Sequence, residues 1–132
     1  MKRLLIIICL LFLLIASLFI DTFTVRRRSI EAKKHLNSIY ELEVAYKFIF
    51  GHYSGNIDAI CFQKEILVTD GGQAIYDVLL HSSTDSTFTA IAVSVIDFDQ
   101  DGQFNTWMVD EKGIITEIIK GDTCKLPWHN VT

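Results

Sequence analysis

Apolar and polar positions divide the first fifty residues into two parts. From Leu4 to Ile20 the chain reads LLIIICLLFLLIASLFI without a charged residue, and charges resume at Asp21. No glycine or proline occurs before Gly51, so nothing in the sequence interrupts a helix over this length. The pattern predicts one continuous helix, about 70 Å long for a rise of roughly 1.5 Å per residue.

The second part of this helix is amphipathic. Apolar residues recur at steps of three and four, at Ile39, Leu42, Tyr46 and Ile49, which is the spacing of one helical face. Gly51 is a good helix terminator. We expect the stripe to pack on a sheet.

Four strand-like runs follow, at residues 74–80, 88–96, 105–110 and 114–119. The second run is rich in β-branched residues, whereas the first is short enough to be a helical turn instead. Glu111-Lys112-Gly113 forms a tight turn sequence between the last two runs. Short turns between neighbours favour an antiparallel meander. The expected fold class is therefore α+β, with a long N-terminal helix packed on a small antiparallel β-sheet.

The apolar run from Leu4 to Ile20 is close to the length of about 17 to 25 residues that a membrane-spanning helix needs. We interpret it as an uncleaved single-pass anchor in the inner membrane, because the small-residue pattern of a cleavage site is missing; a removed signal peptide is the alternative. The expected organisation is an anchor with the first half of the helix at residues 1–28, and an exported head at residues 29–132, in the periplasm or at the cell surface.

Charge narrows the range of partners. Without Lys2 and Arg3, which precede the apolar run, ten of the twelve basic residues remain against sixteen acidic ones, a net charge of −6. An acidic head does not suggest nucleic-acid binding. The basic cluster Arg26-Arg27-Arg28 lies just beyond the apolar run, where it can meet membrane lipid or acidic residues of a neighbouring subunit.

The three cysteines have different expected roles. Cys9 lies within the apolar run and is interpreted as a small hydrophobic residue. In an exported head, Cys61 and Cys124 can form a disulfide that closes a long loop. Nothing local in the sequence shows that these two residues meet.

An acidic loop at residues 97–105 contains the candidate metal ligands of the chain. Its oxygen-bearing residues alternate as in the first nine positions of a calcium loop, and Gly102 allows a sharp turn. The candidate ligands are Asp97, Asp99, Asp101, Gln103 through its backbone carbonyl, Asn105 and, as an extra ligand, Asp110. An EF-hand is excluded, since Met108 stands where the bidentate glutamate would be. The alternative is a solvated acidic turn.

Catalytic motifs are missing from the sequence. The four histidines, His35, His52, His81 and His129, are isolated from one another and show no metal-ligand spacing. No phosphate-binding glycine motif and no nucleophile elbow occur. We therefore do not expect an enzyme.

The order of these segments resembles that of type IV pilins and type II secretion pseudopilins. Residues 31–54, ending in Gly51-His52-Tyr53-Ser54, are similar to the family's helix exit; Phe88-Thr89-Ala90-Ile91-Ala92 resembles its central strand; residues 106–113, TWMVDEKG, resemble its closing hairpin. The resemblance implies a structural subunit that assembles with other pilin-like subunits and their pilus or secretion machinery. Some pseudopilins carry calcium in their heads.

The N-terminus departs from the family pattern. The family has a glycine before its cleavage site and a glutamate near the start of the apolar run, but here no glycine precedes Leu4 and no acidic residue precedes Asp21. In the family the glutamate is implied to neutralise a neighbour's N-terminal amine inside the filament. The alternative function is thus a membrane-anchored, pilin-like binding module, for calcium or a protein partner, that does not polymerise.

Overall fold

The computed structural model describes residues 1–98 and 100–120, apart from the side chains of residues 17–27. Its longest element is helix α1 (Lys2–Phe50). Contacts divide the chain into two units, Met1–Ile30 and Glu31–Thr132, which are treated separately below. We refer to the second unit as the head.

The first unit presents apolar side chains to solvent. Between Leu4 and Ile15 the large apolar side chains are 44–73% exposed. Within the residues that the structure describes, no helix is both long and apolar enough to cross a membrane.

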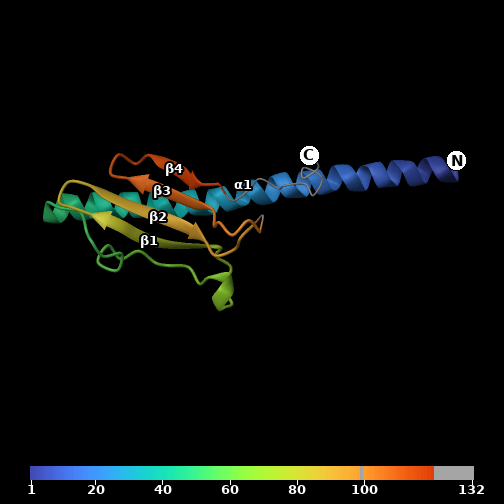
Figure 1. Cartoon of the computed structure of the whole chain (residues 1–132). Helices are drawn as coiled ribbons and strands as arrows, with labels where there is room; N and C mark the ends of the chain where they lie inside the picture. Colours follow the sequence, from blue (N-terminus) through green and yellow to red (C-terminus); the bar gives the residue numbers. More distant parts are fainter. Residues whose placement is uncertain (99, 121–132) are drawn as a thin grey trace. The chain divides into compact units, whose positions relative to one another are not determined.

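The head contains one four-stranded antiparallel sheet in the order β1-β2-β3-β4 (Figure 1). Its strands are β1 (Tyr76–Ser83), β2 (Phe88–Ser94), β3 (Thr106–Asp110) and β4 (Ile115–Ile119). Each strand pairs with its neighbour in the sequence, for example Val78 with Ala92 and Ala92 with Trp107. The predicted meander and the α+β class are confirmed, and the first run is a strand rather than a helical turn.

The core lies between the sheet and the second half of α1. Along β2, buried and half-buried residues alternate, so that Phe88, Ala90 and Ala92 face the interior. The two alanines of β2 belong to the same buried cluster as residues of α1. The opposing face of the helix is buried at Ala32, Leu36, Ile39 and Glu43, which are spaced by three and four.

The predicted apolar stripe was wrong in part. Ile39 is fully buried and Leu42 and Tyr46 pack beside the core, but Ile49 is 70% exposed. The buried face instead includes Glu43, a residue that the apolar pattern could not include. Helix α1 therefore presents a different face to the sheet from the one that hydrophobicity alone predicts.

The segment between α1 and β1 crosses from one end of the head to the other. After Gly51, which adopts a left-handed φ of 80°, Tyr53 and Ile60 return to the core. The chain then forms a short 3-10 helix, η1 (Val68–Asp70), and a bridge between Leu67 and Ala74 that leads into β1. Gly51 thus ends the helix as expected, and Gly71 follows η1 with a left-handed φ of 85°.

Candidate functional site

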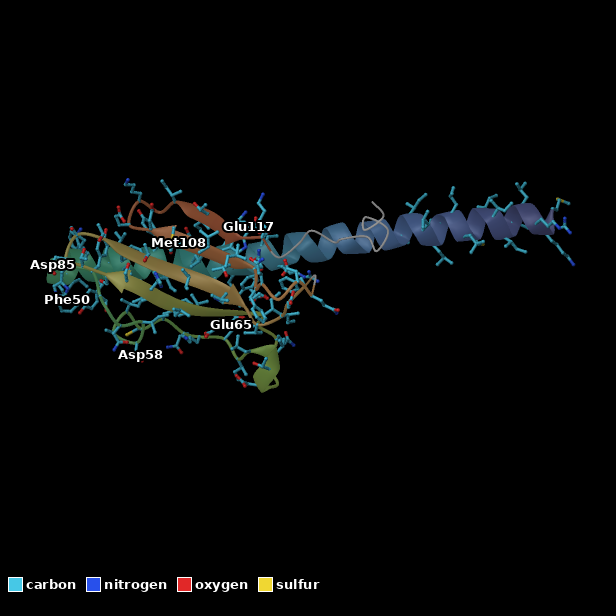
Figure 2. All side chains as sticks on the ribbon, in the orientation of Figure 1. Phe50, Asp58, Glu65, Asp85, Met108 and Glu117 are labelled. Carbon is cyan, nitrogen blue, oxygen red and sulfur yellow. The ribbon has the colours of Figure 1, made fainter. Side chains whose placement is uncertain are left out.

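The head has two distinct ends, which Figure 2 shows through its labelled side chains. Phe50 and Asp85 mark one end, which we call the distal end; Glu65 and Glu117 lie toward the other. We call this second end the proximal end, because the head begins there at Glu31. The predicted acidic loop connects β2 to β3 at the proximal end.

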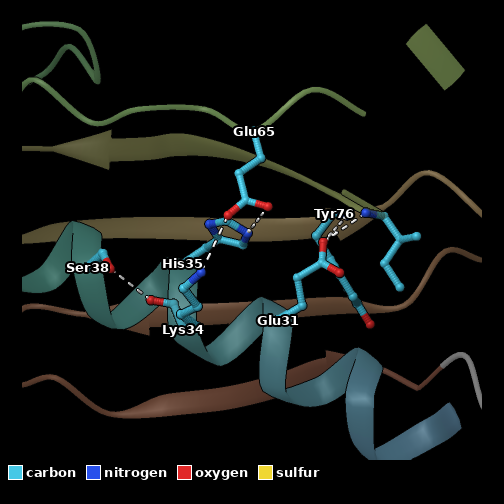
Figure 3. A network of polar contacts seen from close by, with 7 residues as sticks. Glu31, Lys34, His35, Ser38, Glu65 and Tyr76 are labelled. Carbon is cyan, nitrogen blue, oxygen red and sulfur yellow. Dashed lines mark hydrogen bonds and ion pairs between the residues drawn. The ribbon is translucent and has the colours of Figure 1, made fainter. Parts of the chain in front are cut away.

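Glu31 joins the helix to the sheet at the proximal end (Figure 3). Its Oε1 accepts hydrogen bonds from the backbone N–H groups of Ile75, at 2.8 Å, and Tyr76, at 3.1 Å. Tyr76 is the first residue of β1, the first strand of the sheet, and Ile75 immediately precedes it. The carboxylate thus satisfies backbone donors there and fixes the helix against the sheet.

Asn105 is the centre of a buried polar network at the same end. Its Oδ1 accepts hydrogen bonds from the Tyr76 hydroxyl, at 2.6 Å, and from Trp107 Nε1, at 2.8 Å. Its Nδ2 donates to Glu117 Oε1, at 2.7 Å, and to the Ile119 carbonyl, at 2.9 Å. One amide therefore links β1, β3 and β4, and all of its strong donor and acceptor positions are in use.

This network bears on the role predicted for Asn105. A calcium ligand must turn an oxygen lone pair toward the ion, but Oδ1 of Asn105 already accepts two hydrogen bonds from inside the sheet. The side chain is also buried rather than presented to the loop. In the described structure the Asn105 side chain thus joins strands of the sheet, and its role as a calcium ligand stays a prediction.

Asp110, the extra ligand in the predicted calcium set, lies apart from the acidic loop. It ends β3, whereas the acidic loop precedes the start of that strand at Thr106. A strand rises about 3.3 Å per residue, so roughly 16 Å separates positions 105 and 110, far more than one calcium coordination sphere spans. Asp110 Oδ1 instead accepts hydrogen bonds from the Lys112 and Ile114 backbone N–H groups, both at 3.0 Å, and organises the β3–β4 turn.

The rest of the acidic loop is held by its own carboxylates. Asp97 Oδ2 accepts a hydrogen bond from the Gly102 N–H, and Asp101 Oδ1 accepts one from the Gln103 N–H, both at 2.8 Å. Asp99 lies outside the described residues. Among those described, no group of three or more acidic, histidine or cysteine side chains is arranged to hold a metal. Calcium binding by Asp97, Asp99, Asp101 and Gln103 stays a prediction.

A charged cluster secures the crossing segment to the helix (Figure 3). Glu65 lies 3.4 Å from Lys34 Nζ and 4.0 Å from His35 Nε2, and Lys64 forms an ion pair with Asp77 at 3.0 Å. The His35 ring also meets the edge of Phe62. The lysine pairs are exposed and contribute little stability each, so the buried His35 and the half-buried Phe62 define this contact. A small pocket beside them is lined by His35, Phe62, Lys64, Glu65, Tyr76, Asp77 and Val78.

Glu43 is the buried acid that the sequence pattern did not reveal. Its Oε2 accepts a 2.8 Å hydrogen bond from the Ser54 N–H, while Oε1 is buried without a hydrogen-bond partner among the described residues. Burial raises the pKa of Glu43 above its ordinary value of 4.5, and the Ser54 hydrogen bond opposes this rise in part. The spacing of Ala32, Leu36, Ile39 and Glu43 was the available signal, since it places all four on one helical face.

The remaining predicted residues are described only in part. Cys61 is exposed, with a left-handed φ of 57°, and its predicted partner Cys124 lies outside the described residues. In the predicted anchor, Leu4 is exposed on α1, whereas the side chain of Ile20 is not described. No protein-family model matches the chain, and no curated protein sequence matches it either.

Proposed function

We propose that the protein is a pilin-like structural subunit of a type IV pilus or secretion pseudopilus. Residues Leu4 to Ile20 would anchor it in the inner membrane, with the head exported, and would pack against the same helices of other pilin-like subunits during assembly. The observation that supports the proposal is the distribution of exposed and buried apolar side chains along α1. Its first part exposes apolar side chains, and its second part forms the core of a head with an antiparallel meander.

The exposed first part of α1 requires an apolar environment. Every large apolar side chain from Leu4 to Ile15 is at least 44% exposed, so this helix is apolar on all sides. A helix of this kind is stable in lipid or among other helices, but not in water. In a membrane, such helices exchange lipid contact for mutual van der Waals packing, which is how assembly would proceed.

A second candidate function is supported by the amino-acid composition of the proposed anchor. No acidic residue occurs among the first twenty residues, so the chain lacks the glutamate that the resemblance implies for filament packing. A head held singly in the membrane needs no such residue. In this case the protein would be a non-polymerising binding module for calcium or a protein partner.

One pair of substitutions tests anchoring and assembly together. Leu11 stands near the middle of the apolar run, where an arginine costs about 2.5–3.5 kcal/mol of insertion free energy. We expect Leu11→Arg to reduce the carbonate-resistant membrane fraction and remove the chain from sheared filaments, while Leu11→Ile retains both. A wild-type chain that stays in the membrane but never enters filaments would favour the binding module. A wild-type chain released as a soluble head would overturn the anchor.

A further inference from the structure

Both edge strands of the sheet contain a β-bulge. The order β1-β2-β3-β4 leaves β1 and β4 at the two edges, where each pairs on one side within the described residues (Figure 1). In β1, the pairing with β2 continues from Leu80 to Ser82, so His81 is an extra residue. In β4, the pairing with β3 omits Ile118 in the same way. The central pair of strands has no such interruption, so both extra residues lie in edge strands.

The edge formed by β4 has the composition of a strand that pairs readily with other chains. Residues 114–119 read IITEII, which is five β-branched residues and one glutamate. Short segments with high β-propensity, little charge and no proline are typical sites of strand addition and aggregation. The one carboxylate is held against the sheet, because Glu117 Oε1 accepts a 2.7 Å hydrogen bond from Asn105 Nδ2. Charge alone therefore gives β4 little protection.

The bulge at Ile118 interrupts this edge. A bulge bends its strand and increases the local twist, so a further strand cannot follow the edge in regular register. Ile118 is the fourth of the five residues of β4, which leaves only residues 115–117 as a regular edge. Strands in proteins are usually about five or six residues long. The Ile118 side chain is 49% exposed, so the extra residue does not serve to fill the core.

Two features interrupt the edge formed by β1. The crossing segment lies beside its first residues, where Lys64 Nζ donates a 3.0 Å hydrogen bond to Asp77 Oδ1. Side chains of both segments line the small pocket described above. The rest of the strand, residues 79–83, contains the bulge at His81, whose side chain is exposed. The open part of β1 is therefore divided into two short pieces.

We propose that the bulges at His81 and Ile118 prevent two copies of this chain from joining their sheets edge to edge. The inference does not rest on the proposed function, because it concerns only the sheet of the head. It implies that heads contact one another through side-chain surfaces, in a filament or elsewhere, and not through a shared sheet. Removal of a bulge should convert that edge into a site where a second copy adds a strand.

Deletion of the extra residue tests the β4 edge, since the pairs on either side keep their register. Without Ile118, the pair that includes Ile119 follows directly on the pair that includes Glu117. Full-length chains with all three cysteines replaced by serine carry donor or acceptor dyes at Thr116→Cys, an exposed position of β4. After mixing in detergent micelles, we expect energy transfer between copies of the deletion variant about threefold above that between chains with the native edge.

Ile118→Ala is the matched control, because it keeps the extra residue and removes only the side chain. We expect transfer in this variant to equal that of the native edge, so that any association through the apolar helix cancels in the comparison. Unchanged transfer in the deletion variant, with the amides of β2 still protected from hydrogen exchange, would overturn the proposal. An equal rise in Ile118→Ala would assign the effect to the side chain and would also overturn it.

The β1 edge provides an independent test. Deletion of His81, with the dyes at Ser82→Cys, should raise transfer in the same way, whereas His81→Ala should not. A comparison on the native edge needs no deletion: dyes at Thr116→Cys should transfer no more than dyes at Glu41→Cys, an exposed position on α1. Greater transfer at position 116 would show that native β4 edges already pair, and would overturn the proposal whether or not the deletion variants fold.

Discussion

Glu43 Oε2 accepts a 2.8 Å hydrogen bond from the backbone N–H of Ser54. The acid belongs to the buried face of α1 and the donor to the chain that leaves the helix, so one hydrogen bond fixes the reversal of the chain at the distal end. Nearby, Lys47 Nζ lies 4.2 Å from the centre of the Tyr53 ring and packs on the same turn.

Glu43 should make the stability of the head depend on pH. Burial raises its pKa in the folded state above the ordinary value of 4.5, so the folded protein holds this proton more tightly than the unfolded chain does. The stabilisation is complete below that ordinary value and is lost as pH rises through the raised pKa. Glu43→Gln keeps an acceptor for the Ser54 N–H without the charge. We therefore expect the variant to have a Tm a few degrees higher than wild type at pH 8, and an equal Tm near pH 4.

Thermal melting by circular dichroism at several pH values measures this difference. Glu41→Gln is the matched control, since Glu41 is exposed two residues away. A wild-type Tm that falls in parallel with that of Glu43→Gln between pH 4 and pH 8 would show that Glu43 does not cause the dependence.

Removal of the Asn105 amide should destabilise the proximal end of the head. In Asn105→Ala, the Tyr76 hydroxyl and the Trp107 Nε1–H lose their shared acceptor inside the protein. Leaving buried donors unsatisfied costs about 2–4 kcal/mol of unfolding free energy for the pair. Asn37→Ala removes a surface hydrogen bond to Glu41 instead and should cost less than about 0.5 kcal/mol. Urea unfolding followed by tryptophan fluorescence distinguishes the two, and equal losses would contradict this role of Asn105.

Gly72 should tolerate no side chain. A Cβ at this position would meet the carbonyl oxygen of Ile66, which also accepts the N–H groups of Gln73 and Ala74. Gly72→Ala must therefore displace the backbone that leads into β1, at a cost of about 1–3 kcal/mol. A Cβ at Gly55 meets nothing within 4 Å, so Gly55→Ala is the control and should be close to neutral. Amide hydrogen exchange should show lost protection at residues 67–76 in Gly72→Ala, and unchanged exchange there would refute this reading of the turn.

Calcium binding by the acidic loop predicts a ligand-dependent Tm. If Asp97, Asp99, Asp101 and Gln103 hold the ion, calcium at 100 times its Kd should stabilise the folded chain by about 2.7 kcal/mol. Asp101→Asn should reduce this shift, whereas Asp110→Asn should leave it intact because Asp110 lies at the other end of β3. A Tm that calcium does not change would support a solvated turn.

The helix and the strands could be predicted from the sequence because each depends on residues that are close together along the chain. The breaker-free first fifty residues form α1, Gly51 ends it, and the β-branched run after Phe88 forms the central strand. The buried face of α1 could not be predicted in this way, since the Glu43 carboxylate is buried against a backbone donor eleven residues further along the chain, the Ser54 N–H. Folding brings this partner close to Glu43, and the spacing of apolar residues along the helix cannot reveal it.

The acidic loop shows the same limit. Its composition located a loop between two strands, and the structure confirms that position. Counting oxygen-bearing residues at alternate positions could not show that Asn105 turns into the sheet or that Asp110 is carried away along β3. Those outcomes depend on strand direction and on which neighbours supply donors.

We propose that α1 anchors the chain and builds it into a filament, and intact-mass spectrometry of filaments sheared from expressing cells tests this proposal most directly. We expect the chain to be recovered in the sheared fraction with its apolar run, residues 4–20, intact. Recovery of the chain only from the membrane fraction, with its N-terminus still at Met1, would contradict assembly and leave a singly anchored head.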